Sequence, residues 1–310
     1  MTTNDLRVAP AQQIGPLQVW PLLWESLTSH QYKVSSPLDH LEFAEFEEED
    51  GPVVDWIQVH NPTNNPILIP SGWVISKDLL QERTLISAEY VEPHSTTAIN
   101  VSCVEKGRWE ETETIRPLVR APISVMAAGF DFDSNKGMWV LDPKTRQTRV
   151  WNQIERHENR SGVRTTNSLT QIMEEGLKIL DVQKSVMKEL HANLNIYPKQ
   201  NGVLIALDGQ PLLSEFFSNP EGIRLTVRKT LLAASFDATS LEPKGIHKEQ
   251  VVKFLDQVRA TKIHAIQEES WGVHFSGGSE SLDTHLTKSS DERVMRVSTI
   301  NRNHRSLVGV

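Results

Sequence analysis

Cysteine is nearly absent from this 310-residue chain, which contains only Cys103. A single cysteine cannot form an internal disulfide, and it cannot complete a zinc site built from cysteine pairs. Basic residues are in the minority, because 32 Lys and Arg stand against 40 Asp and Glu, for a net charge of −8. No global positive field therefore favours nucleic acid as a partner. The acidic run at 45–50 would repel a phosphate backbone.

Long apolar runs are missing as well. None approaches the roughly 20 residues that a membrane helix needs, and the first 17 residues lack the basic start and apolar core of a signal peptide. We therefore expect a cytoplasmic protein with no membrane partner. The apolar share of 38% is enough for a buried core at this length. No cofactor is indicated, and nothing in the sequence specifies an oligomeric state.

The first half of the chain is predicted to be β-rich. Segments 17–24, 41–46 and 53–61 are rich in branched and aromatic residues and are bounded by turn formers. Two further segments, 84–92 and 97–105, are predicted to pair as a hairpin.

The alternation of side chains along the second predicted hairpin strand, 97–105, indicates which way the lone cysteine faces. It places Cys103 on the same face as Ile99 and Val101. A free cysteine in that position behaves as a small apolar residue, so Cys103 is predicted to belong to the core.

From about residue 145 the apolar residues recur at intervals of three and four, which predicts helices. An apolar stripe along 169–190 predicts one buried helix side, with a break marked by Asp181. A strand, an Asp-Gly turn and a return strand are predicted at 201–213. Two more helices are predicted at about 220–236 and 246–266.

The tail at 271–300 returns to short strands separated by Gly, Ser and Asp. Strands at both ends with helices between them predict an α+β fold. In this fold the C-terminal strands complete the N-terminal antiparallel β layer. We expect a single domain over 1–310, with a β-rich part at 10–142, a helix-rich part at 145–266 and closing strands at 271–300.

Three segments resemble one family when they are taken together: 57–109, which ends in "SCVEKGRW", 201–238, and the closing glycine-containing strands. They resemble the bacterial ARPP domain, which is named for its association with ADP-ribosylglycohydrolases and rhodanese-phosphatases. The resemblance spans roughly residues 10–300. It implies a link to ADP-ribose or NAD-type nucleotide metabolism but no defined reaction, so whether the protein is an enzyme stays open.

The family pattern ahead of the hairpin has acidic residues around a glycine, followed by Lys or Gln and then Arg. Here Lys77, Gln81 and Arg83 match the later positions. The acidic positions hold other residues, namely Pro70, Ser71, Trp73 and Val74. If those carboxylates carry catalysis or a metal in relatives, this chain has lost them.

Gln81 and Arg83 would share one face of an extended chain. Together with Lys77 they suit a pyrophosphate or carboxylate group, because arginine binds such groups through two parallel hydrogen bonds. The structural alternative is a solvated edge on which Arg83 pairs with a nearby carboxylate, namely Glu82, Glu89 or Glu105.

Glu105, Arg108 and Trp109 follow the second hairpin strand. They would complete a ligand site if Glu105 lay beside Arg83 and Trp109 stacked on a base. In the structural alternative, Glu105 accepts backbone N–H bonds near Gly107 and Trp109 covers an edge of the sheet.

Nucleophilic and metal chemistry have little support. Cys103 would need an adjacent base, and the nearest histidine in the sequence, His94, lies at the far turn of the predicted hairpin. No two histidines have metal-ligand spacing on a helix, so no metal is predicted.

Three functions remain, and they differ in class. The favoured one is a ligand-binding or regulatory protein that holds a nucleotide-like or anionic ligand near Arg83. The first alternative is a hydrolase of an ADP-ribose-type nucleotide, with Glu105, Asp78 and Glu82 as the nearest carboxylates. The second is a scaffold that docks a protein partner, for which eight tryptophans supply apolar contact area.

Overall fold

The computed structural model describes most of the chain. It covers residues 5–27, 32–34, 40–48, 51–75, 81–105, 119–141, 143–163, 168–267, 273–289 and 291–307. No helix within these ranges is long and apolar enough to cross a membrane.

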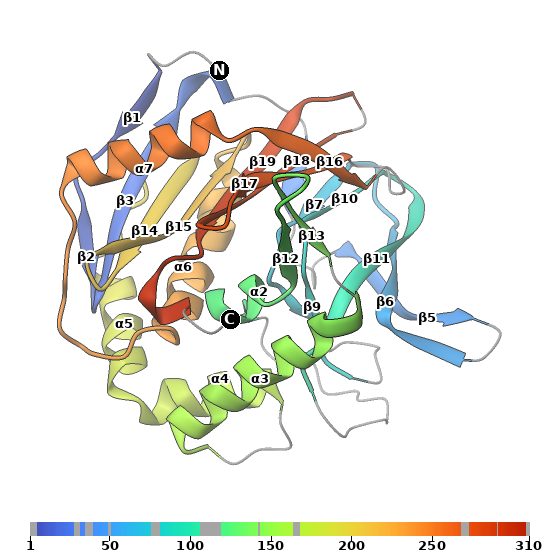
Figure 1. Ribbon diagram of the computed structural model, residues 1–310, viewed down its shortest axis with the longest axis horizontal. Helices are drawn as coiled ribbons and strands as arrows, with labels where there is room; N and C mark the ends of the chain where they lie inside the picture. Colours follow the sequence, from blue (N-terminus) through green and yellow to red (C-terminus); the bar gives the residue numbers. More distant parts are fainter. Residues whose placement is uncertain are drawn as a thin grey trace.

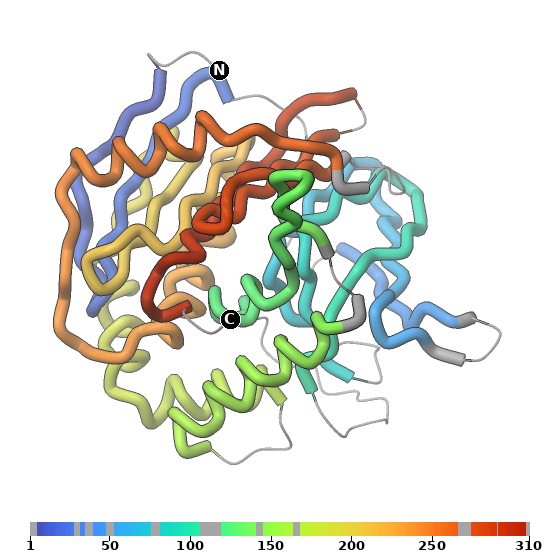
Figure 2. Tube along the Cα trace, in the orientation of Figure 1, coloured from blue at the N-terminus to red at the C-terminus, as the bar shows by residue number. Residues whose placement is uncertain are grey.

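The largest sheet has nine strands in the described residues and joins both ends of the chain, with the order β1-β3-β14-β15-β19-β18-β17-β16 and β2 also paired to β3. Figure 2 shows the N-terminal segment beside strands near residue 200, where β14 pairs antiparallel with β3. The strands are β1 (Leu6–Val8), β2 (Gln12–Ile14), β3 (Leu17–Trp24), β14 (Gly202–Leu207), β15 (Gln210–Phe217), β16 (Ile263–Gln267), β17 (Val273–Ser279), β18 (Leu282–Lys288) and β19 (Val294–Asn301).

Smaller sheets form the rest of the β structure. A five-stranded sheet has the order β5-β6-β11-β9-β8, a three-stranded sheet the order β10-β7-β4, and β12 pairs with β13. The strands are β4 (Lys33–Val34), β5 (Glu42–Glu48), β6 (Gly51–Asn61), β7 (Ile67–Ile69), β8 (Val74–Ile75), β9 (Arg83–Leu85), β10 (Glu89–Val91), β11 (Ser95–Cys103), β12 (Phe130–Asp133) and β13 (Met138–Leu141).

The helices lie mostly between these strand groups in the sequence, so the predicted α+β class is confirmed. In Figure 1, α7 crosses one face of the large sheet, and α3, α4 and α5 follow one another along the lower edge of the molecule. The helices are α2 (Ile123–Ala127), α3 (Pro143–Ser161), α4 (Leu169–Ile179), α5 (Asp181–Ala192), α6 (Glu221–Ser235) and α7 (Lys248–Ala260), with short 3-10 turns at Glu25–Leu27 and Arg305–Leu307.

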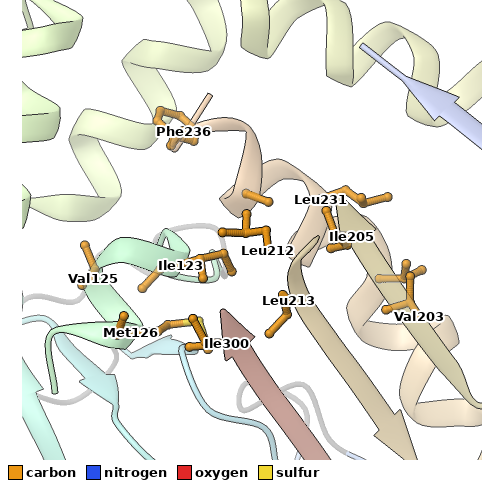
Figure 3. Close-up of a cluster of buried hydrophobic side chains, with 14 of the residues drawn as sticks. Ile123, Val125, Met126, Val203, Ile205, Leu212, Leu213, Leu231, Phe236 and Ile300 are labelled. Atoms are coloured by element: carbon orange, nitrogen blue, oxygen red, sulfur yellow. The ribbon is translucent and has the colours of Figure 1, made fainter. Parts of the chain in front are cut away.

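Strand β14 is buried along its whole length because helices cover both faces of the large sheet. Val203 and Ile205 point into the cluster that contains α4, α5 and α6, whereas Leu204 and Ala206 point into the cluster that contains α7. Figure 3 shows the first cluster, in which side chains from α2, β14, β15, α6 and β19 converge. A strand buried on both faces is expected to be a continuous apolar run, as "GVLIAL" is.

Two local predictions are confirmed. Asp208 and Gly209 have φ values of 54° and 77°, as the turn between β14 and β15 requires at both central positions. The helical stripe breaks at Leu180, which is extended and lies between α4 and α5. Asp181 then opens α5, where a carboxylate favours the helix N-terminus.

The predicted hairpin of 84–92 with 97–105 is confirmed only at Thr84 and Leu85, which pair with Ser102 and Val101. The first segment is divided into β9 and β10, and β10 pairs with β7 instead. Strand β11 pairs with β6 along its first six residues and with β9 along its last three. Strand β11 has β6 and β9 as its two neighbours, and the rest of the predicted hairpin does not form because 89–91 pair with β7.

Candidate functional site

Four residues define a cluster that we call the Cys103 corner: Gln81, Arg83, Cys103 and Glu105. The cluster lies at the end of the β9–β11 pair, where Cys103 lies opposite Arg83. The backbone continues the pairing past the strands, because the N–H of Val104 donates to the carbonyl of Glu82 at 2.9 Å. The corner is therefore held by main-chain bonds on both of its segments.

The side chains of the corner contact one another. The Nη1 atom of Arg83 donates to Oε1 of Gln81 at 3.2 Å, so these two side chains lie together as their alternation predicts. The thiol of Cys103 lies 3.2 Å from the same oxygen and 2.9 Å from the carbonyl oxygen of Glu105. The structure thus brings together three of the six predicted ligand residues, namely Gln81, Arg83 and Glu105.

Arg83 is only 1% exposed. Its Nη2 atom lies 3.6 Å from the carboxylate of Glu45 on β5, a partner that the sequence did not indicate. Within the described residues the Nε atom of Arg83 has no hydrogen-bond partner. A buried guanidinium with unused donors is uncommon, since nearly all buried polar groups are hydrogen-bonded.

The carboxylates of Glu82 and of Glu105, a member of the corner, hold neighbouring parts of the fold in place. Glu82 accepts from the hydroxyl of Ser168 at 2.9 Å and from the backbone N–H of Thr170 at 3.2 Å, at the start of α4. Glu105 accepts the backbone N–H of Glu82 at 3.1 Å. Glu105 therefore does accept a backbone bond, as the structural alternative expects, although the donor is Glu82. Gly107 lies outside the described residues.

Cys103 is 1% exposed, which confirms the predicted core position. Burial raises the pKa of its thiol, and the nearby Arg83 offsets this only in part. The backbone of Cys103 is also occupied, because its N–H and carbonyl both bond to the side-chain amide of Gln147 on α3, at 2.9 and 2.7 Å. A buried thiol with a raised pKa is a poor nucleophile.

Lys77, Arg108 and Trp109, the other three predicted ligand residues, lie outside the described residues, as does Asp78. They belong to 76–80 and 106–118, which join the described chain at Gln81 and Glu105.

A second polar cluster escaped the sequence analysis. We call it the polar seam, because it lies where the C-terminal strands face the N-terminal half of the chain. Its members are Ser71, Ser87, Glu89, Arg120, Glu215, His274, Asp283, His285, Arg296 and Ser298. Polar residues at alternate positions of β18 and β19 were its only sequence signal, and that pattern is equally typical of a solvated sheet face.

At the centre of the seam, Glu215 binds two arginines, and all three side chains are at most 1% exposed. Arg120 donates to both carboxylate oxygens at 2.8 Å, and Arg296 donates through Nε and Nη2 at 2.8 and 2.5 Å. Burial alone would raise the pKa of Glu215, but the two guanidinium groups outweigh it and lower the pKa to about 2. We call these three residues the Glu215 clasp.

Asp283 and His285 line a small cavity beside the clasp, of about 20 Å³, which is room for one water molecule. Asp283 is fully buried, and its carboxylate contacts Nε2 of His285. The imidazole of His285 also packs on Phe130, with the ring centres 4.2 Å apart. This cavity is too small for a nucleotide, so the seam does not offer a ligand pocket of that class.

Ser124, His157 and Asp237 are brought together from distant parts of the chain. The hydroxyl of Ser124 lies 2.8 Å from Nε2 of His157, and Asp237 lies 3.7 Å from the same nitrogen. A catalytic triad needs the acid on the other ring nitrogen. Asp237 instead accepts backbone N–H bonds at the start of α2, from Ile123 at 2.7 Å and Ser124 at 3.4 Å. The cluster caps a helix and does not form a triad.

Metal chemistry has no site of the usual kind in the described ranges, where no three His, Cys, Asp or Glu side chains gather as ligands.

Comparison with known proteins gives one result. A family model matches residues 5–300, and its description is ARPP-1, the ARG and Rhodanese-Phosphatase-superfamily-associated Protein domain. Searches of curated proteins and of solved structures find no match. The match covers nearly the whole chain and confirms the resemblance carried by the segments at 57–109 and 201–238. The protein belongs to the ARPP-1 family.

Proposed function

We propose that this protein is a ligand-binding or regulatory member of ADP-ribose or NAD-type nucleotide metabolism, and that it binds a nucleotide-like anion near Arg83. Membership of a family named for its association with the ARG and rhodanese-phosphatase superfamilies supports the metabolic link. The site rests on the Cys103 corner.

The observation that carries the proposal is the spare donor capacity of Arg83. Its Nε atom has no partner among the described residues, and its bonds to Gln81 and Glu45 are long, at 3.2 and 3.6 Å. A guanidinium away from water binds a phosphate or carboxylate more strongly than an exposed one does, because the local dielectric is low. An anion that approaches the corner would find these donors ready.

Lys77, Arg108 and Trp109 are included in the proposed site through chain connectivity. Lys77 and Trp109 are four residues from Gln81 and Glu105 respectively, and four residues span at most roughly 14 Å. Two cations and an indole within that reach would complement a phosphate and a base.

Binding is favoured over hydrolysis because the nearby carboxylates already have structural roles. Glu82 and Glu105 accept backbone hydrogen bonds, which makes them poor general bases. Hydrolysis of an ADP-ribose-type nucleotide is the alternative, and Asp78 is the third carboxylate that the sequence offers for it.

The test is isothermal titration of the purified protein with ADP-ribose, NAD and AMP, repeated with Arg83→Lys. Lysine keeps the charge but loses the paired donors. Loss of a charged hydrogen bond costs about 1.5–3 kcal/mol, so we expect affinity for the bound nucleotide to fall about 10- to 100-fold. Chromatography of the nucleotide after incubation then separates a binder from a hydrolase.

Arg7→Lys is the matched control, because Arg7 is an exposed arginine that pairs with Glu25. It should leave the affinity unchanged. Absence of binding by all three nucleotides at millimolar concentration would contradict the proposal and favour the scaffold alternative, in which the partner is a protein. Equal losses of nucleotide affinity in the two variants would mean that Arg83 is not part of the binding site.

A further inference from the structure

A cleft lies where five separate parts of the chain meet, and it is distinct from the Cys103 corner. Its volume is about 180 Å³. We call it the tyrosine cleft, because two of the three tyrosines in the chain line it. Its lining residues are Tyr32, Pro66, Tyr90, Ser218, Ser289, Asp291, Arg293, Val294 and Met295.

Tyr32 lines the cleft, and its hydroxyl is fully engaged in hydrogen bonds. The hydroxyl donates to the carbonyl of Met295 at 2.9 Å and accepts from Ser218 Oγ at 2.9 Å and the N–H of Asn219 at 3.1 Å. Burial raises the pKa of the Tyr32 hydroxyl, so the group stays neutral at physiological pH. These bonds fix the position of the Tyr32 side chain in the lining of the cleft.

Tyr90 supplies a second aromatic wall and is only 6% exposed. Burial raises its pKa strongly, and the charges of Glu92 and Asp291 raise it further. The Tyr90 hydroxyl therefore also remains neutral. Pro66 and Val294 add apolar contacts to the two tyrosines, whereas Ser218, Ser289, Asp291 and Arg293 make the rest of the lining polar. Aromatic and apolar walls beside polar groups suit a flat ring that carries a polar substituent.

Arg293 stands at the rim of the cleft with its side chain 59% exposed. Its Nε atom lies 2.8 Å from Asp291. In the part of the chain that the structure describes, neither of its terminal nitrogens has a partner. The rim is held in place because the Ser289 N–H donates to the Arg293 carbonyl at 3.0 Å and the Arg293 N–H donates to Ser289 Oγ at 3.2 Å. A guanidinium that is bound through Nε leaves its two Nη atoms available to bind an anion.

We propose that the tyrosine cleft binds a small anion that carries one planar ring system, with the ring system between Tyr32 and Tyr90 and the anionic group on the Nη edge of Arg293. The volume of about 180 Å³ suits one flat ring system, since a cavity of about 150 Å³ in another protein holds benzene. Drug-sized ligands need about 300 Å³ or more. This site is independent of the one proposed near Arg83.

Ligand-observed NMR with benzoate, adenine, AMP and inorganic phosphate tests the proposal on the full chain. Benzoate and AMP combine a ring with an anionic group, whereas adenine and phosphate each lack one of the two. We expect saturation transfer to the rings of benzoate and AMP, with at least tenfold weaker binding of adenine and of phosphate. Arg293→Gln should weaken benzoate about tenfold or more and should leave adenine unchanged.

The matched control is Arg7→Gln, because Arg7 is an exposed arginine in an ion pair at a different place. It should not affect benzoate. No transfer to benzoate or AMP at millimolar concentration, or equal weakening by the two variants, would overturn the cleft. Arg83→Lys separates the two sites, because it should leave benzoate binding intact. If AMP binding depends on Arg83 and not on Arg293, and benzoate does not bind, the cleft is wrong and the proposed function stands.

Discussion

The Cys103 corner and the Glu215 clasp both bury arginine beside a carboxylate, but they satisfy it to different degrees. In the clasp, two guanidinium groups share one carboxylate through bonds of 2.5–2.8 Å. In the corner, Arg83 has an ion pair of 3.6 Å with Glu45 and an Nε atom without a partner in the described ranges. A cluster whose guanidinium donors are all bonded is suited to stabilising the fold. A guanidinium with donors that are not bonded is suited to binding a ligand.

The largest effect is expected from breaking the clasp with Glu215→Gln. This change keeps the shape of the side chain but leaves Arg120 and Arg296 buried together without a counter-charge. Removing one partner of a buried ion pair costs about 3–5 kcal/mol, and urea unfolding with both midpoint and slope measured would reveal it.

Glu25→Gln is the control for that variant, since Glu25 pairs with Arg7 at the surface. Exposed pairs contribute about 1 kcal/mol or less. Equal losses in the two variants would show that the clasp is no more important to the fold than a surface pair.

The clasp should also respond to acid. Because the folded pKa of Glu215 is lowered from its ordinary 4.5 to about 2, the unfolded chain binds the proton more readily in this window. The stabilisation is therefore complete above pH 4.5 and is lost as the pH falls from 4.5 towards 2. Unfolding free energies of the wild type and Glu215→Gln should converge over that range. A constant difference between them would mean that Glu215 does not titrate with a lowered pKa.

The smallest effect is expected in a comparison of Arg83→Lys with Arg296→Lys. Arg296 loses short, charge-assisted bonds to Glu215, and each such bond contributes about 1.5–3 kcal/mol. Arg83 has only long contacts to lose, so its variant should be destabilised by about 1 kcal/mol or less. Thermal unfolding monitored by circular dichroism would rank the two. The reverse order would mean that the corner holds the fold and has no capacity to spare for a ligand.

Much of the local structure followed from the sequence. The Asp208–Gly209 turn, the break before Asp181 and the core position of Cys103 each depend on a few neighbouring residues and a simple periodicity. For the candidate site, the alternation of Gln81 and Arg83 was sufficient to place these side chains together. The Glu45 partner of Arg83 was not foreseen, because β5 reaches this corner only through the pairing of β5, β6 and β11.

By itself, the sequence determined the α+β class and the family. It also determined the core position of Cys103 and the buried stripe along 169–190, because periods of 2 and 3.6 residues are visible in short segments. Tertiary structure alone decided which strands pair and which distant charges meet. Glu215 contacts Arg120 and Arg296 across 95 and 81 positions of the chain, and five separate parts of the chain meet at the tyrosine cleft. Such long-range contacts depend on the combined packing of many elements, since no local sequence pattern specifies which distant residue a side chain will contact.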